Sequence, residues 1–192
     1  MQHYPALISI LEITGILGST LAAGFNISTS YLTIPIITAP TPGLKPHAST
    51  LALKWKTLYD RGKLAVIPLG MGSAAAFALR ALLEFKNPST VGSKVVSKDS
   101  AGSLFVVAAI LAISFAPYTQ IIMGGVNEAL GRRAVVAAAA AAGGGASDEQ
   151  KDENRVQELI ERWSQLNLVR GVILLGAAVV GSWAAFAAGG GL

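Results

Sequence analysis

The ten residues Leu104–Ile113 read LFVVAAILAI and contain no polar side chain. A helix on the surface of a soluble protein needs a polar face, so this stretch is typical of a helix that faces lipid. It belongs to a longer apolar stretch, and the chain has three more of that kind. A helix of about 20 apolar residues crosses the core of a bilayer. The sequence therefore predicts an all-α fold, a four-helix transmembrane bundle in a single domain over residues 1–192, with membrane helices at roughly 8–37, 64–83, 104–126 and 168–188.

The composition supports a membrane protein and gives no sign of a cofactor. Hydrophobic residues make up 52% of the chain and charged residues 14%, against about 25% charged in soluble domains. There is no cysteine, no HxxxH pattern for a metal, and no recognition motif for nucleic acid. The glycine runs Gly70–Gly72 (GMG) and Gly143–Gly145 (GGG) match no phosphate-binding loop. We expect the lipid bilayer as a partner, and neither a metal, a cofactor nor nucleic acid.

The connecting segments differ in character. Thr38–Ser49 is rich in proline, which breaks helices, and Ala134–Ser147 (AVVAAAAAAGGGAS) is predicted to be a mobile linker. Residues 50–63 and 148–165 carry helical apolar stripes that run on into the second and fourth apolar stretches. Helices two and four are therefore expected to extend beyond the bilayer on the same side, which we name the motif side.

The distribution of basic residues predicts an orientation. Four crossings place both termini on one side and the first and third connections on the motif side. Eleven of the 15 lysines and arginines fall on the motif side, and the others are Arg80, Lys86, Lys94 and Lys98. The positive-inside rule then predicts a cytosolic motif side, with both termini across the membrane.

The motif side contains three polar segments. The spacing of the first, Trp55–Lys63 (WKTLYDRGK), favours an interfacial belt of aromatic and basic residues over a functional site. In the second, Ala116–Arg133, Pro117 is expected to kink the third helix, and Asn127 and Glu128 follow nearly three turns later. In the third, Trp163, Asn167 and Arg170 have i, i+4, i+7 spacing and share one helix face. Their spacing alone leaves two interpretations open: an interhelical hydrogen-bond clamp or a ligand site.

Taken together, the three segments resemble the fungal anthrone oxygenase family. The resemblance covers essentially the whole chain, with the same four-helix plan, and departs from the family in the Ala/Gly segment after Arg133. It is carried by WKxxYDRGK followed by a proline, then PxTxxIxxxxNEAL, then WxxLNxxRG. The matching residues are Trp55, Tyr59, Asp60, Arg61, Gly62, Pro68, Pro117, Thr119, Asn127, Glu128, Leu130, Trp163, Asn167, Arg170 and Gly171.

The resemblance implies a tailoring step in aromatic polyketide synthesis, the oxidation of an anthrone to an anthraquinone by dioxygen without a cofactor. Such a monooxygenase would need a base, a partner for a developing oxyanion, and a flat apolar pocket. Candidate bases are Asp60, Glu128 and His47, and the candidate oxyanion partner is Arg170 with Asn167 and Asn127, or alternatively Arg61. The expected substrate-binding residues are Trp55, Tyr59, Arg61, Trp163 and Thr119.

Two classes of function remain open. One is the enzyme, whose polar and aromatic residues would converge on one pocket at the motif-side boundary of the membrane. The other is a non-enzymatic membrane scaffold or assembly protein that uses the same polar face as an interhelical clamp.

Overall fold

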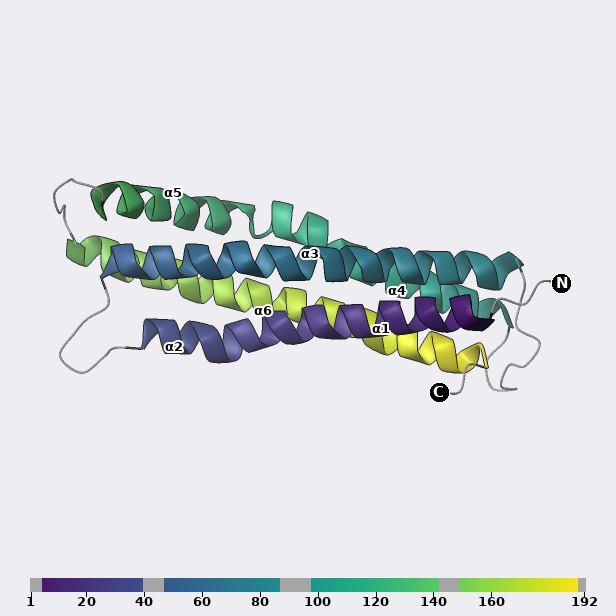
Figure 1. The fold of residues 1–192 in the computed structure, drawn as a ribbon. Helices are drawn as coiled ribbons and strands as arrows, with labels where there is room; N and C mark the ends of the chain where they lie inside the picture. The colour runs from purple at the N-terminus through teal and green to yellow at the C-terminus, as the bar shows by residue number, and fades with distance from the viewer. Residues whose placement is uncertain (1–4, 40–46, 87–97, 142–148, 190–192) are drawn as a thin grey trace.

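The fold is helical in every element of the chain that the structure, a computed structural model, describes: residues 5–39, 47–86, 98–141 and 149–189 (Figure 1). The all-α prediction is confirmed. The elements are α1 (Pro5–Ser28), a π-helical turn η1 (Thr29–Thr33), α2 (Ile34–Thr38), α3 (Ala48–Lys86), α4 (Lys98–Ile121), α5 (Gly124–Ala141) and α6 (Glu149–Ala187).

Four segments of the described chain are long and apolar enough to cross a membrane, which confirms the predicted transmembrane bundle. They are Pro5–Thr38, Ala48–Lys86, Ala101–Ile121 and Asn154–Ala187. The 39 residues of α3 measure about 58 Å at 1.5 Å per residue, well beyond a bilayer core of about 30 Å. In Figure 1, α1 begins and α6 ends at the same end of the bundle. We call this the terminal end, and the opposite one, where α3 and α6 begin, is the motif side.

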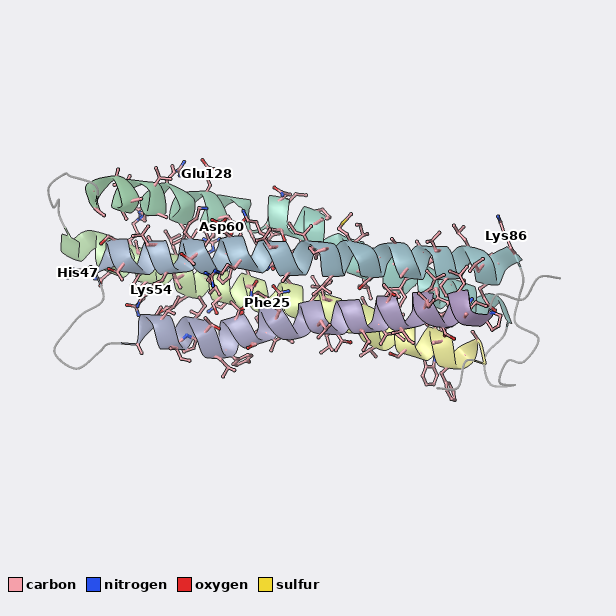
Figure 2. The ribbon with its side chains drawn as sticks, viewed as in Figure 1. Phe25, His47, Lys54, Asp60, Lys86 and Glu128 are labelled. Carbon is pink, nitrogen blue, oxygen red and sulfur yellow. The ribbon has the colours of Figure 1, made fainter. Side chains whose placement is uncertain are left out.

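The outward faces of the helices are apolar. Ile10 is 59% exposed, Leu64 80%, Ile110 59% and Val179 62%. Apolar surface on this scale is rare on a soluble monomer but suits contact with lipid. Figure 2 shows side chains projecting outward along the whole length of the bundle.

At the terminal end, the interior combines small residues, aromatic rings and one buried ion cluster. A Cβ added to Gly181 would lie 2.4 Å from the ring of Phe77, so α6 can approach α3 only because position 181 is glycine. Arg80, 2% exposed, donates from Nε to Glu12 (2.8 Å) and from Nη1 to Glu84 (2.7 Å). Arg80 therefore neutralises buried carboxylates, a structural reason for its presence that is separate from membrane orientation.

The third membrane helix differs from the prediction. Pro117 lies inside α4, but the break comes later, at Ile122–Met123, where both backbone N–H groups donate to the carbonyl of Tyr118 (2.9 and 3.3 Å). α5 then follows to Ala141 along α3. Residues 134–141, part of the predicted linker, are thus helical, in keeping with the high helix propensity of alanine. Residues 142–147 lie outside the described part of the chain.

Candidate functional site

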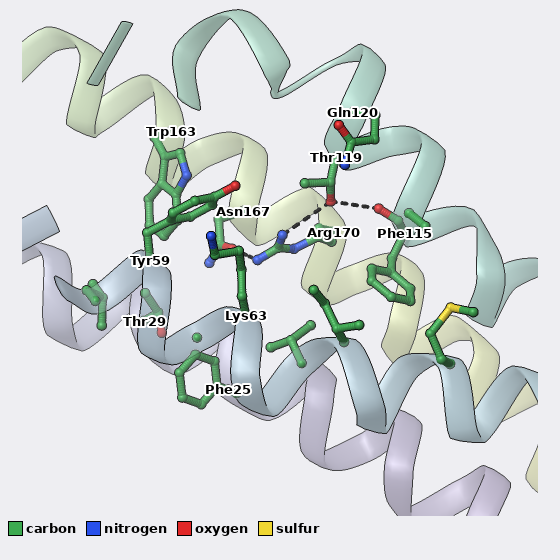
Figure 3. Close-up of a pocket in the computed structure, with 16 residues that line it drawn as sticks. Phe25, Thr29, Tyr59, Lys63, Phe115, Thr119, Gln120, Trp163, Asn167 and Arg170 are labelled. Atoms are coloured by element: carbon green, nitrogen blue, oxygen red, sulfur yellow. Dashed lines mark hydrogen bonds between the residues drawn. The ribbon is translucent and has the colours of Figure 1, made fainter. Parts of the chain in front are cut away.

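A pocket lies between the helices where the motif side meets the membrane-spanning bundle (Figure 3). Its empty space, with the open mouth and the solvent in it included, is about 740 Å³. Most of its lining is apolar, with a few polar groups concentrated on one side. The residues that matter for its chemistry come from α1 and η1 (Phe25, Thr29), α3 (Tyr59, Lys63), α4 (Phe115, Thr119) and α6 (Trp163, Asn167, Arg170).

Arg170 is held in this pocket by neutral side-chain oxygens from three helices. Its Nε and Nη2 both donate to Asn26 Oδ1 (3.1 and 2.5 Å), Nη2 also donates to Asn167 Oδ1 (2.5 Å), and Nη1 donates to Thr119 Oγ1 (3.2 Å). Asn26 is fully buried, and its own Nδ2 donates to the carbonyl of Ala22 (2.7 Å). That bond turns the amide oxygen of Asn26 toward the guanidinium group.

Asn167 connects this network to the irregular part of the first membrane helix. The side chain is 1% exposed, and its Nδ2 donates to the carbonyl of Asn26 (2.9 Å) and to Ser30 Oγ (3.1 Å). Ser30 belongs to the π-helical turn Thr29–Thr33 and also donates to the carbonyl of Ser164 (2.9 Å). Turns of this kind within α-helices are frequent at functional sites. Here the turn and Asn167 together fix α1 against α6 beside the pocket.

The charge of the pocket is positive. Of its described lining residues, only Lys63 and Arg170 are ionic, and no described carboxylate pairs with Arg170. A guanidinium group has five N–H donors, and four are used by Asn26, Asn167 and Thr119. The second N–H of Nη1 has no acceptor among the residues that the structure describes. A partly buried cation held by neutral groups favours a ligand that carries negative charge.

An aromatic wall forms one side of the pocket. Tyr59 and Trp163 line it, and Trp55 lies behind them, completely buried. Trp55 stacks on Tyr59 with ring centroids 5.0 Å apart and meets Trp163 edge-on at 6.0 Å. Trp163 Nε1 donates to Asn127 Oδ1 (3.0 Å), so Asn127 orients Trp163 from α5. Trp55 and Asn127 therefore support the wall from behind.

The remaining residues predicted for the site lie farther out. Asp60 is about 43% exposed and pairs with Lys56 and with Lys63 (3.0 Å), so it borders the pocket through Lys63. Glu128 is 68% exposed and pairs with Arg132 on the outside of α5 (2.6 Å; Figure 2). Arg61 is exposed, and His47 is exposed next to the start of α3, so neither lines the pocket.

The sequence analysis missed Asn26 and Lys63. Asn26 lies in the apolar stretch 8–37, where a carboxamide group is costly unless it has partners inside the bundle. That cost is the signal in the sequence that points to Asn26. Lys63 was grouped with the interfacial cations, although its Nζ lies 4.5 Å from the ring centroid of Tyr59 and its side chain lines the pocket.

The chain is similar to known proteins over most of its length. The chain is 25% identical to "Anthrone oxygenase tpcL" of Aspergillus fumigatus over 176 residues, which cover 92% of this chain and 93% of that protein. It is 23% identical to "Monooxygenase hypC" of Dothistroma septosporum over 171 residues, covering 89% of this chain and 80% of that one. No solved structure matches. The family model for anthrone oxygenase matches residues 55–180, which include all three polar segments, and the chain therefore belongs to the anthrone oxygenase family.

Proposed function

We propose that this protein oxidises an anthrone-type aromatic polyketide to an anthraquinone with dioxygen, and that the reaction takes place in the pocket around Arg170. The observation that carries the proposal is a guanidinium group with no carboxylate partner among the described residues and one unused N–H, set beside an aromatic wall. The names and the family of its relatives support the same class of reaction.

The chemistry needs an environment that favours an anion. The methylene carbon of the anthrone loses a proton, and its C–H electron pair moves into the ring system to give an anthrolate. The anthrolate passes one electron to dioxygen, the resulting radical and superoxide combine at that carbon, and protonation gives a hydroperoxide. Loss of water from the hydroperoxide leaves the quinone. One oxygen atom enters the substrate and the other leaves in water, and the substrate supplies all the electrons.

Arg170 would stabilise the anthrolate oxygen through its unused Nη1 donor. The anion is stabilised more than the neutral anthrone, so the interaction lowers the barrier to ionisation. The bonds to Asn26, Asn167 and Thr119 hold the guanidinium group in place before the substrate arrives. Tyr59 and Trp163 would contact the flat polycycle, with Trp55 fixing Tyr59 from behind.

For the proton we propose a relay through Lys63 to Asp60. Lys63 Nζ lies 3.0 Å from Asp60 Oδ1, and Lys63 lines the pocket. In the relay, the ammonium group of Lys63 gives a proton to the carboxylate while its nitrogen receives the proton of the methylene. Asp60 pairs with a residue that lines the pocket, whereas Glu128 and His47 do not line it, so the proposal gives these two no part.

The rival function, a non-enzymatic scaffold, also has an observation in its favour. Arg170 joins α6 to Asn26 on α1 and to Thr119 on α4, which makes it an interhelical clamp whatever else it does. A clamp alone gives no reason for a pocket beside it or for an unused donor. Purified protein in lipid nanodiscs, incubated with an anthrone under air, should form quinone far faster than empty nanodiscs, as followed by absorbance. Quinone formation at the background rate would exclude the enzyme and leave the scaffold as the function.

The proposal also includes the orientation, with the motif side in the cytosol and both termini across the membrane. A protease site placed after Ala141 should be cut from outside sealed microsomes, and one placed at the C-terminus should be protected. The reverse pattern of cleavage would show that the protein has the opposite orientation.

A further inference from the structure

We infer that the pocket opens sideways into the bilayer, and that a flat amphiphilic substrate enters it from the lipid between α3 and α4. The inference rests on the proposed function for the identity of the substrate, and on the geometry of the pocket for the route.

The outer edge of the pocket follows one face of α3. Lys63, Ile67 and Met71 are spaced four residues apart and all line the pocket. They are also exposed: the side chain of Lys63 by 43%, Ile67 by 47% and Met71 by 45%. Deeper in, Val66 is 2% exposed and Asn167 is 1%. The lining thus runs from an exposed edge, which we call the lip, to a buried floor.

The lip crosses the boundary between headgroups and hydrocarbon. Eight residues separate Lys63 from Met71, a rise of about 12 Å along the helix. Lys63 follows the charged segment that begins at Lys56, and on the facing helix the exposed Gln120 lies at the same mouth. Toward Met71 the exposed side chains are apolar, as on the lipid-facing surface of α3. One edge of the opening therefore meets water and the other meets acyl chains.

The packing of α3 against α4 explains why the opening is where it is. A Cβ added to Gly70 would lie 2.5 Å from the ring of Phe115, so the two helices are in close contact at that level. This contact closes the pocket toward the terminal end. On the motif side of it the small residue Ala116 of α4 lines the pocket, and α4 ends at Ile121. The gap is therefore open between the Gly70–Phe115 contact and the end of α4.

Such a lip suits an anthrone. A planar apolar polycycle with a few oxygens at one edge concentrates in the bilayer near the headgroups, with its polar edge toward water. Sliding past Ile67 and Met71, between α3 and α4, it would carry its oxygens toward Lys63 and Arg170 without leaving the apolar phase. The route avoids transferring the rings through water, which is unfavourable at about 25 cal/mol for each Å² of apolar surface.

The chain contains no cysteine, which allows a direct test with single-cysteine variants. Met71→Cys places a nitroxide spin label on the lip, and Leu64→Cys is the matched control. Leu64 is on the same helix, is 80% exposed and does not line the pocket. Both variants are labelled in detergent, reconstituted in nanodiscs and studied by electron paramagnetic resonance with 1,8-dihydroxyanthraquinone as the probe.

Three results are expected. Dioxygen should increase the spin relaxation rate of the label at position 71 more than a water-soluble nickel chelate does. That difference would report that the label contacts lipid. The anthraquinone should immobilise the label at 71 and leave the label at 64 unchanged. The labelled Met71→Cys protein should oxidise anthrone with kcat/KM at least tenfold below that of the labelled Leu64→Cys protein.

Two outcomes separate the route from the reaction. If the quinone immobilises the label at 71 but the wild-type protein oxidises no anthrone, the entrance stands and the proposed function fails. If the protein oxidises anthrone and neither the quinone nor the label at 71 has an effect, the function stands and the lateral entrance is overturned.

Discussion

Arg170→Ala separates the two roles that the structure gives to this residue. The substitution removes three interhelical hydrogen bonds, two to Asn26 and one to Thr119. Bonds of this kind average about 0.6 kcal/mol in a membrane protein, so the stability should fall by about 2 kcal/mol. From a total of at least about 5 kcal/mol, that leaves more than roughly 99% of the molecules folded.

The loss of rate should be much larger than the loss of folded protein. Removing one donor to a developing oxyanion costs about 10²–10³ in rate, equivalent to about 2.7–4 kcal/mol. Arg170→Lys keeps the charge but not the planar fork, so an intermediate rate is expected. Quinone formation is measured per folded molecule, with size-exclusion chromatography and thermal unfolding as the measures of folding.

Asn26→Leu is the matched control for the clamp. It removes two of the four hydrogen bonds to Arg170, and Asn26 does not line the pocket. It should lower stability by about 1 kcal/mol, as estimated from the same average, while the rate falls no more than about tenfold because the cation remains. Arg170→Ala protein with wild-type turnover would refute the catalytic role and leave the clamp alone.

Three further outcomes test other parts of the molecule. Asp60→Asn should lower the oxidation rate by about 10²–10⁴, as expected for a lost proton acceptor, while Glu128→Gln should keep it; equal rates in the two variants would exclude the relay. Gly171→Ala should destabilise the bundle by about 1–3 kcal/mol, because the added Cβ would lie 2.9 Å from Ile27 Cγ1. Gly24→Ala is the control and should not destabilise it, because a Cβ at position 24 would have no atom within 4 Å. Thermal unfolding measures the stability of both variants. Arg80→Ala should destabilise by about 3–5 kcal/mol through the buried carboxylates left behind, and would be visible as loss of folded protein in detergent.

The fold was predictable because lipid imposes a strong constraint on sequence. Every membrane-spanning segment must be a long run of apolar residues, and Leu104–Ile113 has no polar face that a soluble helix would need. The break after Ile121 was not predictable from Pro117, because a proline can remain inside a helix when its neighbours compensate for the lost hydrogen bond. Nor could a helix over residues 134–141 be predicted apart from the glycines Gly143–Gly145, since the whole segment has a low-complexity sequence.

Part of the site could be predicted because helical spacing fixes which residues share a face. Trp163, Asn167 and Arg170 do line one pocket, as i, i+4, i+7 spacing on α6 indicated. What spacing cannot give is the partner on another helix. Asn26 is 144 residues away from Arg170 in the chain, and only the packing of α1 on α6 brings its amide oxygen to the guanidinium group.

The choice between clamp and site, which the sequence left open, does not have two exclusive answers. Asn26, Asn167 and Thr119 satisfy four of the five donors of Arg170, and the same bonds hold α1, α4 and α6 around the pocket. A cation bound by neutral oxygens keeps its charge uncompensated, whereas a carboxylate partner, like those of Arg80, would cancel it. The protein thus contains two arginines in opposite settings inside the bundle, Arg80 buried and Arg170 partly buried. The one neutralised by Glu12 and Glu84 stabilises the bundle, and the one held by amides and a hydroxyl is the cation that the proposed reaction uses for its anion.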